Sequence, residues 1–113
     1  MTYRKSIYVQ SQFISYHKWA KAPKIVAFLR NWHRHVFKVR IDLGVEHNER
    51  ELEFFMVLAD LDAVLKPWQH TQVSWSCEKF CEKIAVHLRP KYPTLFMVGV
   101  SEDGENGAVL HLN

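Results

Sequence analysis

The stretch HRHVFKVRIDLGV, residues 33–45, alternates apolar and polar side chains more regularly than any other part of the chain. Successive side chains of an extended strand point to opposite faces, so residues two apart share a face. We therefore predict a strand from about Arg34 to Glu46. Its apolar face carries Phe37, Val39, Ile41, Leu43 and Val45, and its polar face carries Lys38, Arg40 and Asp42. The same rule places His33 and His35 on the apolar face, where the strand begins.

The chain from about Tyr3 to Trp19 alternates in the same way and predicts a second long strand. One face carries Ile7, Val9, Phe13 and His17, and the other carries Tyr8, Gln10, Gln12 and Tyr16. Between the two strands, the connection from Ala20 to Asn31 is interrupted by Pro23. Its apolar run over residues 25–29 is expected to form a lid or a short helical turn.

After a polar turn at residues 47–50, the periodicity changes from that of a strand to that of a helix. Residues 51–57 look like a short extension paired back on the strand before them, with the start of a helix as the alternative. Residues 58–66 have helical apolar spacing, and Pro67 ends this helix. Residues 68–75 are expected to form a loop. A second helix is predicted from Ser76 to about Leu88, capped by Ser74 or Ser76. Its apolar face includes Cys77, Phe80, Cys81, Ile84 and either His87 or Leu88.

Two further strands complete the chain. Residues 89–93, with two prolines, end the second helix, and a strand is expected from Thr94 to Glu102. The chain is then expected to turn through residues 103–107 into a last strand from Ala108 to Leu112, with Asn106-Gly107 as a strong hairpin signal. We therefore expect one α+β domain over residues 1–113. Its element order is β-β-α-α-β-β, with two helices on one face of an antiparallel four-stranded sheet.

The charges are distributed unevenly along the chain. Residues 1–41 contain nine lysines or arginines and no carboxylate, whereas all twelve carboxylates follow from Asp42 onward. A basic half attracts anions such as nucleic-acid phosphates or a small phosphorylated substrate, unless the two halves neutralise one another in the fold. No apolar run reaches the length of a membrane span, and the N-terminus does not resemble a signal peptide. We therefore expect a soluble cytoplasmic protein.

The two cysteines, Cys77 and Cys81, are four residues apart on one predicted helix. This spacing differs from the C-x-x-C spacing of redox and zinc motifs. One helical turn also holds the two Cα atoms in poor geometry for a disulfide. We expect both to be reduced thiols in the core.

Three histidines indicate a metal site. His33 and His35 share one strand face, and His17 closes the neighbouring strand, so their three imidazoles can converge on one point. Three neutral nitrogen ligands with a fourth position left open are typical of catalytic zinc. A His-x-His pair on a strand is by itself more often packed or exposed without a metal.

With this element order and these histidines, the chain resembles the 6-pyruvoyl-tetrahydropterin synthase and 6-carboxytetrahydropterin synthase family, which has the tunnelling fold. The resemblance covers nearly the whole chain. The family's first zinc histidine follows a phenylalanine by four residues, as His17 follows Phe13, and its H-G-H motif is similar to His33-Arg34-His35. Glu102 stands where the family has a glutamate that holds the pterin's amino-pyrimidine edge. The T-S-E motif that starts the family's second helix is echoed by Ser76-Cys77-Glu78.

The resemblance implies zinc bound by His17, His33 and His35, a pterin ring anchored by Glu102, and a ring-shaped homo-oligomer, expected to be a hexamer, with pockets between subunits. The implied reaction is that of a lyase. It converts 7,8-dihydroneopterin triphosphate to a 6-substituted tetrahydropterin with loss of triphosphate. In the carboxy branch, this chemistry leads to 7-deazaguanines such as queuosine precursors.

The chain departs from the family where protons are transferred. The family's catalytic cysteine lies four residues before the H-G-H motif, and here that position is Leu29. The family's Asp-His pair corresponds to Gln69-His70, and a glutamine cannot stabilise an imidazolium as a carboxylate does. His70 is therefore the best candidate for the catalytic acid or base.

Three functions follow, in descending order of preference. The chain is a zinc-dependent enzyme acting on a phosphorylated dihydropterin, or a zinc- or pterin-binding relative that has lost turnover and serves as a binding module. Nucleic-acid binding is the least favoured. It would rest on aromatic residues interleaved with cations, since such a surface suits base stacking and phosphate contacts. The aromatic residues are Tyr16, Trp19, Phe28 and Trp32, and the cations are Lys18, Lys21, Lys24, Arg30 and Arg34.

Overall fold

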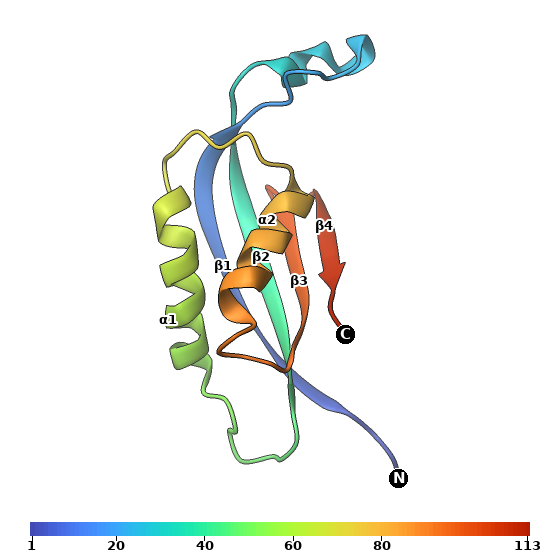
Figure 1. Ribbon diagram of the computed structural model, residues 1–113, viewed down its shortest axis with the longest axis vertical. Coiled ribbons are helices and arrows are strands. Elements are labelled where there is room, and N and C mark those ends of the chain that lie inside the picture. Colours follow the sequence, from blue (N-terminus) through green and yellow to red (C-terminus); the bar gives the residue numbers. More distant parts are fainter.

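The computed structural model describes all residues from 1 to 113 and contains one antiparallel sheet covered by helices on a single face (Figure 1). The strands lie in the order β1-β2-β3-β4, which is also their order along the chain. They are β1 (Lys5–His17), β2 (His33–Val45), β3 (Leu95–Glu102) and β4 (Asn106–His111). The helices are α1 (Phe54–Leu65) and α2 (Cys77–Leu88), with short 3-10 helices η1 (Lys24–Arg30) and η2 (Lys66–Trp68). The predicted order β-β-α-α-β-β is confirmed.

The long β1–β2 hairpin extends beyond the rest of the sheet at one end. β1 and β2 pair over their whole length, from Lys5 opposite Val45 to His17 opposite His33. β3 stops earlier, because its last residue, Glu102, lies opposite Phe37. The first four residues of β2 and their partners in β1 therefore overhang the end of β3. This overhang carries all three predicted metal-binding histidines.

The hydrophobic core lies between the sheet and the two helices, as the predicted strand faces require. The apolar face of β2 contributes four fully buried side chains, and Val9 and Phe13 of β1 are buried beside them. The four are Phe37, Val39, Ile41 and Leu43. Phe13 stacks on Phe37 with ring centroids 5.0 Å apart, and Phe80 of α2 packs against both rings. Burying one such side chain stabilises the fold by roughly 1.5–3 kcal/mol.

Helix α1 begins at Phe54, so the extension expected over residues 51–57 is wrong and the alternative, the start of a helix, is confirmed. Glu53 has an extended backbone, and its carboxylate accepts a hydrogen bond from the backbone N–H of Met56, which caps the helix at Phe54. Val57, Leu61 and Leu65 then fall on one buried stripe at helical spacing. The exposed residues 54–56 form the first turn. Pro67 lies in η2, directly after the end of α1.

Helix α2 confirms its prediction, with Ser76 as the cap. The Ser76 hydroxyl accepts a hydrogen bond from the backbone N–H of Lys79 at 3.1 Å. The predicted apolar face is buried, with Leu88 rather than the exposed His87 as its last member. Cys77 and Cys81 are both buried free thiols, as expected.

The turn between β3 and β4 lies at the start of the predicted turn over residues 103–107, so β4 begins two residues earlier than predicted. Asp103 and Gly104 are the central residues, with φ of 58° and 74°, and the N–H of Glu105 donates to the carbonyl of Glu102. Two positive φ angles are what a type I′ turn requires, and Asp-Gly satisfies them as well as Asn-Gly does. Asn106 and Gly107 instead begin β4. A Cβ atom at position 107 would lie 2.3 Å from the carbonyl oxygen of Val100, so only glycine fits there.

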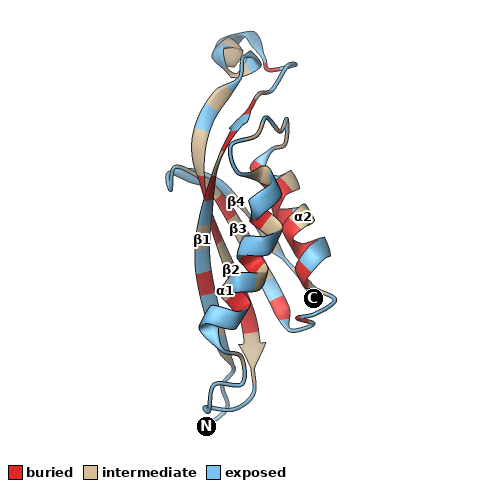
Figure 2. Cartoon of the chain, turned by 90° about the vertical axis from the view of Figure 1, so that its left-hand side faces the viewer, coloured by how far each residue is buried: buried red, intermediate tan, exposed pale blue.

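The connection between β1 and β2 forms an arm that projects from one end of the molecule (Figures 1 and 2). The apolar run expected to form a lid or a helical turn is the 3-10 helix η1, which contains no buried residue. The arm and the loop before α1 lie at opposite ends of a molecule whose longest dimension is 53 Å. None of the helices is long and apolar enough to cross a membrane.

Candidate metal centre

The overhang of the β1–β2 hairpin brings the three histidines together. His17 and His33 are directly opposite each other in the register, with ring centroids 4.4 Å apart, and His35 lies 5.0 Å from each of them. Glu102 at the end of β3 completes the group. One ligand atom from each of these four side chains lies within 4.8 Å of the other three.

Hydrogen bonds fix which nitrogen of each imidazole faces the centre of the group. The Nδ1 atoms of the three rings lie 3.1, 2.8 and 2.6 Å from acceptors: the Trp75 carbonyl, the Asn31 carbonyl and the Asp103 carboxylate. Each Nδ1 therefore carries the proton, and each Nε2 presents a lone pair. All three Nε2 atoms are buried and without a hydrogen-bond partner. Three buried lone pairs directed at one point form a cation-binding arrangement.

The Glu102 carboxylate strengthens this conclusion. Its Oε2 atom lies 2.6 Å from Nε2 of His35 and 3.5 Å from Nε2 of His17. With the ring protons on Nδ1, a nitrogen lone pair and a carboxylate oxygen face each other at 2.6 Å. Such a contact is favourable only when a cation or a proton is shared between the two atoms. Two ligands of one tetrahedral zinc ion lie about 3.3 Å apart, whereas 2.6 Å is the length of a hydrogen bond. The donor set that fits zinc is therefore the three imidazole nitrogens, with the Glu102 carboxylate beside them.

His17 is the deepest of the three rings and is held in the neutral form. Burial lowers its pKa from the usual 6.5, and the neighbouring His33 and His35 lower it further, against the opposing effects of the Trp75 carbonyl and Glu102. A ring with a lowered pKa is neutral at physiological pH, and the neutral imidazole is the form that binds a metal.

Asp103 orients His35 from outside the ligand group. One carboxylate oxygen lies 2.6 Å from Nδ1 of His35, and the other accepts a hydrogen bond from the backbone N–H of Val36 at 2.9 Å. The Val36 N–H, and after it His35, keeps the pKa of Asp103 below its ordinary value. A carboxylate bonded to the outer nitrogen of a ligand histidine fixes the ring and increases its basicity. The sequence analysis missed this residue, although the Asp103-Gly104 turn signal was available to locate it.

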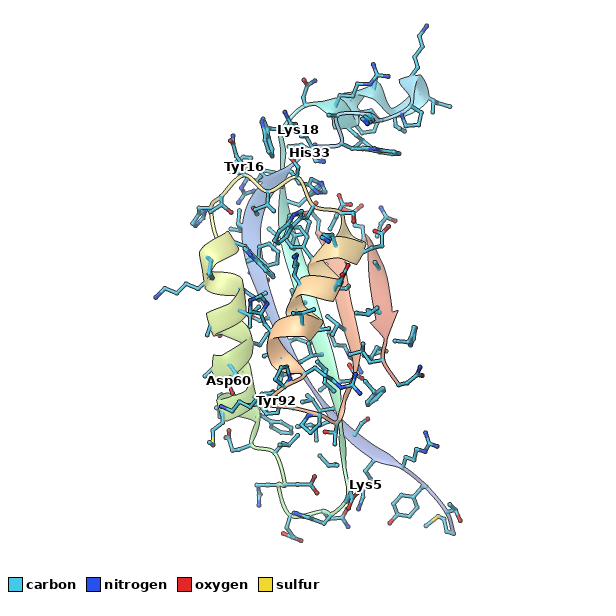
Figure 3. All side chains as sticks on the ribbon, in the orientation of Figure 1. Lys5, Tyr16, Lys18, His33, Asp60 and Tyr92 are labelled. Carbon is cyan, nitrogen blue, oxygen red and sulfur yellow. The ribbon has the colours of Figure 1, made fainter.

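A cavity of about 680 Å³ opens onto the group. Its walls include His17, His33 and Glu102, together with Leu29 of the arm and the first turn of α2. Lys18 and Lys79 also line it, and their two positive charges lie beside the carboxylates of Glu78 and Glu102 in the same wall. Figure 3 shows Lys18 and His33 together at the base of the arm.

Cys77 lies closer to the site than the sequence suggested. Its thiol is 3.9 Å from Oε1 of Glu102, and it also lines the cavity. Burial, and after it the charge of Glu102, raises the pKa of Cys77 to about 12. At neutral pH it is therefore a protonated thiol that donates to the carboxylate, so Glu102 accepts from Cys77 with one oxygen and approaches the histidines with the other.

His70 lies outside this group. It has a positive φ of 58°, and its backbone N–H donates to the carbonyl of Ile14 at 2.6 Å. The side-chain oxygen of Gln69 accepts a hydrogen bond from the Ile14 N–H. Gln69 and His70 therefore bind their loop to the outer edge of β1. The His70 residue is exposed and is neither in the metal-ligand group nor on the cavity wall. Its catalytic role remains a prediction.

The fold and the site can now be compared with known proteins. By sequence, the chain matches no protein-family model and no curated protein. Its structure superposes on that of a Caenorhabditis elegans 6-pyruvoyl tetrahydropterin synthase with a TM-score of 0.78. The fold is the tunnelling fold. The match covers 97% of this chain and 96% of the nematode enzyme, at 12% sequence identity, so the two share an architecture over their whole length.

Proposed function

We propose that this protein is a zinc-dependent enzyme of the lyase type that acts on 7,8-dihydroneopterin triphosphate or a closely related pterin. The observation that carries the proposal is the convergence of three unpartnered imidazole Nε2 atoms at the wall of a cavity. The full-length structural similarity to a tetrahydropterin synthase supports the pterin class of substrate. Within that class, the 6-carboxytetrahydropterin branch, which supplies 7-deazaguanine and queuosine precursors, is the branch we favour.

His17, His33 and His35 would hold the metal, and Glu102 lies within reach as a fourth ligand. A zinc ion held by neutral imidazoles keeps its full positive charge, polarises a substrate hydroxyl or carbonyl, and acidifies the adjacent C–H bond.

Glu102 would also recognise the substrate. A carboxylate accepts two parallel hydrogen bonds from a planar N–C–N edge, such as that of an amino-pyrimidine, in the geometry that it uses with arginine. Because Glu102 lies between the histidines and Cys77, a ring bound to it would lie in the cavity beside the proposed metal ligands. Lys18 and Lys79 in the cavity wall would attract the phosphates of the substrate.

Proton transfer is the step for which this chain has the fewest suitable groups. Leu29 occupies the cavity wall where the family has a cysteine, and an aliphatic side chain moves no proton. Cys77 is held as a thiol by its high pKa. We therefore assign the acid-base role to His70, which faces outward from its own subunit and would serve a pocket shared with the next subunit of a homo-oligomeric ring, expected to be a hexamer.

A second candidate function is a zinc- or pterin-binding protein without turnover. The presence of Leu29 in the cavity wall favours it, because the ligand set and the Glu102 carboxylate remain while the side chain best placed for proton transfer is inert. This protein would bind a pterin and release it unchanged.

One experiment separates the two candidates. The zinc-loaded protein is incubated with 7,8-dihydroneopterin triphosphate, and the products are separated by chromatography, with Glu102→Gln and His70→Ala as test variants. His111→Ala, which changes an exposed histidine on β4, is the matched control. Enzymatic function predicts a new tetrahydropterin product from wild type and the control, and greatly reduced product from both variants. Binding without conversion would favour the second candidate, and absence of both binding and conversion would contradict the pterin assignment.

A further inference from the structure

Two exposed apolar patches lie at opposite ends of the long axis, and they carry opposite charge. The first is on the basic arm, which we define as residues 18–32. The second is on the acidic end, which we define as residues 46–56, comprising the loop after β2 and the first turn of α1. Figures 1 and 2 show the arm and the loop before α1 projecting at opposite ends of the molecule, with mostly exposed residues.

The basic arm combines cations with large apolar side chains that no other part of the chain covers. Ile25 is 90% exposed and Phe28 is 71% exposed, and the flanking Trp19 and Trp32 are exposed as well. The arm contains four lysines or arginines and no carboxylate, a net charge of +4. None of these four cations forms a salt bridge; Lys18 instead lies over the ring of Trp32.

The acidic end has the complementary composition. Phe55 is 78% exposed, and its neighbours Phe54 and Met56 are exposed as well. Four glutamates against one arginine give residues 46–56 a net charge of −3. The side chains of Glu46 and Glu49 have no hydrogen-bond or salt-bridge partner within the chain. A cavity of about 480 Å³ opens beside them, and its lining includes Phe54, Phe55 and Leu52. Lys5 of β1 also lines it, and its ammonium donates to Oδ1 of Asn48 at 2.6 Å, so one cation from outside residues 46–56 lies against the acidic end.

An exposed cluster of aromatic and aliphatic side chains marks an interaction surface, and complementary charge determines which partner it fits. The arm also has almost no buried side chain of its own, apart from Ala22, so packing against another surface would stabilise it. The two ends are too far apart in one molecule to meet, since the longest dimension is 53 Å.

We propose that the basic arm of one copy docks on the acidic end of a second copy, with Ile25 and Phe28 against Phe55 and the cavity beside it. The contact joins two different surfaces, so it is heterologous and links copies in a directed way. Because His17 and His33 flank the arm and Leu29 lies in the cavity wall, the partner copy sits next to the metal centre and holds the arm over it. This contact does not depend on the identity of the substrate.

Site-specific cross-linking tests the contact. Phe28→Cys and a size-tagged Phe55→Cys protein are mixed and treated with a short bis-maleimide, and cross-linked species are resolved by mass. The native thiols are buried, and wild type measures their background. Phe28→Cys mixed with Val109→Cys, an exposed position on β4, is the control; Val109 is 55% exposed. The proposal predicts a cross-linked heterodimer from the first mixture and none from the control.

Charge reversal sharpens the test, because the exposed lysines and glutamates chosen have no side-chain partners within the chain whose loss would unfold it. Lys21→Glu with Lys24→Glu in the arm, or Glu46→Lys with Glu49→Lys at the acidic end, should each lower the cross-linking yield about tenfold. Mixing the protein with the charge-reversed arm and the protein with the charge-reversed acidic end should restore the cross-linking yield. An absent cross-link in the unreversed pair, or a yield unchanged by reversal, would overturn the proposal. Arm-dependent binding of a single-stranded oligonucleotide or an anionic vesicle, without any cross-link, would overturn it in favour of that partner.

Turnover of the pterin substrate is measured on the same variants as a separate readout. A cross-link without turnover would support the contact and contradict the enzymatic function. Turnover without a cross-link would support the enzymatic function and contradict the contact. The two proposals can therefore fail independently.

Discussion

The two halves of the β1–β2 hairpin have the same backbone and the same alternation, but they differ in what covers them. In the body of the molecule, the side chains that face the helices, such as Phe13, Val39 and Ile41, are buried beneath them. In the overhang, on the same faces of β1 and β2, the side chains are those of His17, His33 and His35. Apolar side chains occur where the helices exclude water, and the candidate metal ligands occur where the helices end and a cavity opens. The same strand face thus provides stability along one part and chemistry along the other.

This comparison predicts that changes in the body alter stability and leave the metal centre intact. Leu61 on α1 is fully buried against the sheet. We expect Leu61→Ala to lower the free energy of unfolding by about 2–5 kcal/mol, through lost burial and the cavity left behind. Urea unfolding in the presence of a chelator measures this loss. Zinc stoichiometry of the folded variant should equal that of wild type, and a loss of zinc in the folded protein would show that the two halves are not separable.

Changes around the overhang should have the opposite effect. Asp103→Asn replaces the carboxylate that holds Nδ1 of His35 with a neutral amide. Removal of such a partner costs about 10–100-fold in metal affinity, and we expect that loss in a competition titration against a chromophoric chelator. Glu105→Gln, in the same turn and without a side-chain partner, is the control and should bind as wild type does. Equal affinity in Asp103→Asn would remove this residue from the site.

The smallest effect is expected at a polar contact far from the metal centre. Tyr92 donates its hydroxyl to Asp60 of α1, at the end of the body opposite to His33 (Figure 3). Tyr92→Phe should cost about 1 kcal/mol in the free energy of unfolding and leave metal binding unchanged. A cost near zero in urea unfolding would mean that this contact adds nothing to the body.

The same contact predicts a pH dependence. Burial, and after it the hydrogen bond to Asp60, raises the pKa of Tyr92 to about 12, against an ordinary value of 10.0. Above pH 10, the unfolded chain loses the phenolic proton while the folded chain keeps it, so stability falls as the pH rises from 10 to 12. Tyr92→Phe should lack this part of the decline, which the difference between the two unfolding profiles measures. Parallel profiles would contradict the raised pKa.

Much of the fold follows from local patterns in the sequence. The alternation in β1 and β2 predicts which side chains face the helices, and Ser76 predicts where α2 begins. The errors arise where local patterns are ambiguous. Asp103-Gly104 and Asn106-Gly107 are both turn signals, and the choice depends on contacts of Asp103 with β2 that are distant in sequence. Residues 54–56 are apolar but exposed, so they mimic a strand although Glu53 caps a helix there.

The convergence of the three histidines was predictable from the regular alternation of the two strands. The two-residue period places His33 and His35 on one face, and a hairpin brings His17 opposite His33. The approach of Glu102 to the rings, the support from Asp103 and the proximity of Cys77 depend on how far β3 extends and how α2 packs. Those distances are tertiary, and no spacing along the chain encodes them.

The most direct test of the account is zinc content per chain, measured by elemental analysis after exhaustive dialysis of zinc-loaded wild type and His33→Ala, with His111→Ala as control. If three imidazoles hold one metal, wild type and the control retain one zinc per chain, and His33→Ala retains none, because two remaining histidines bind zinc weakly. Full zinc occupancy in His33→Ala, or wild type that retains no zinc, would contradict the assignment of this overhang as a metal centre.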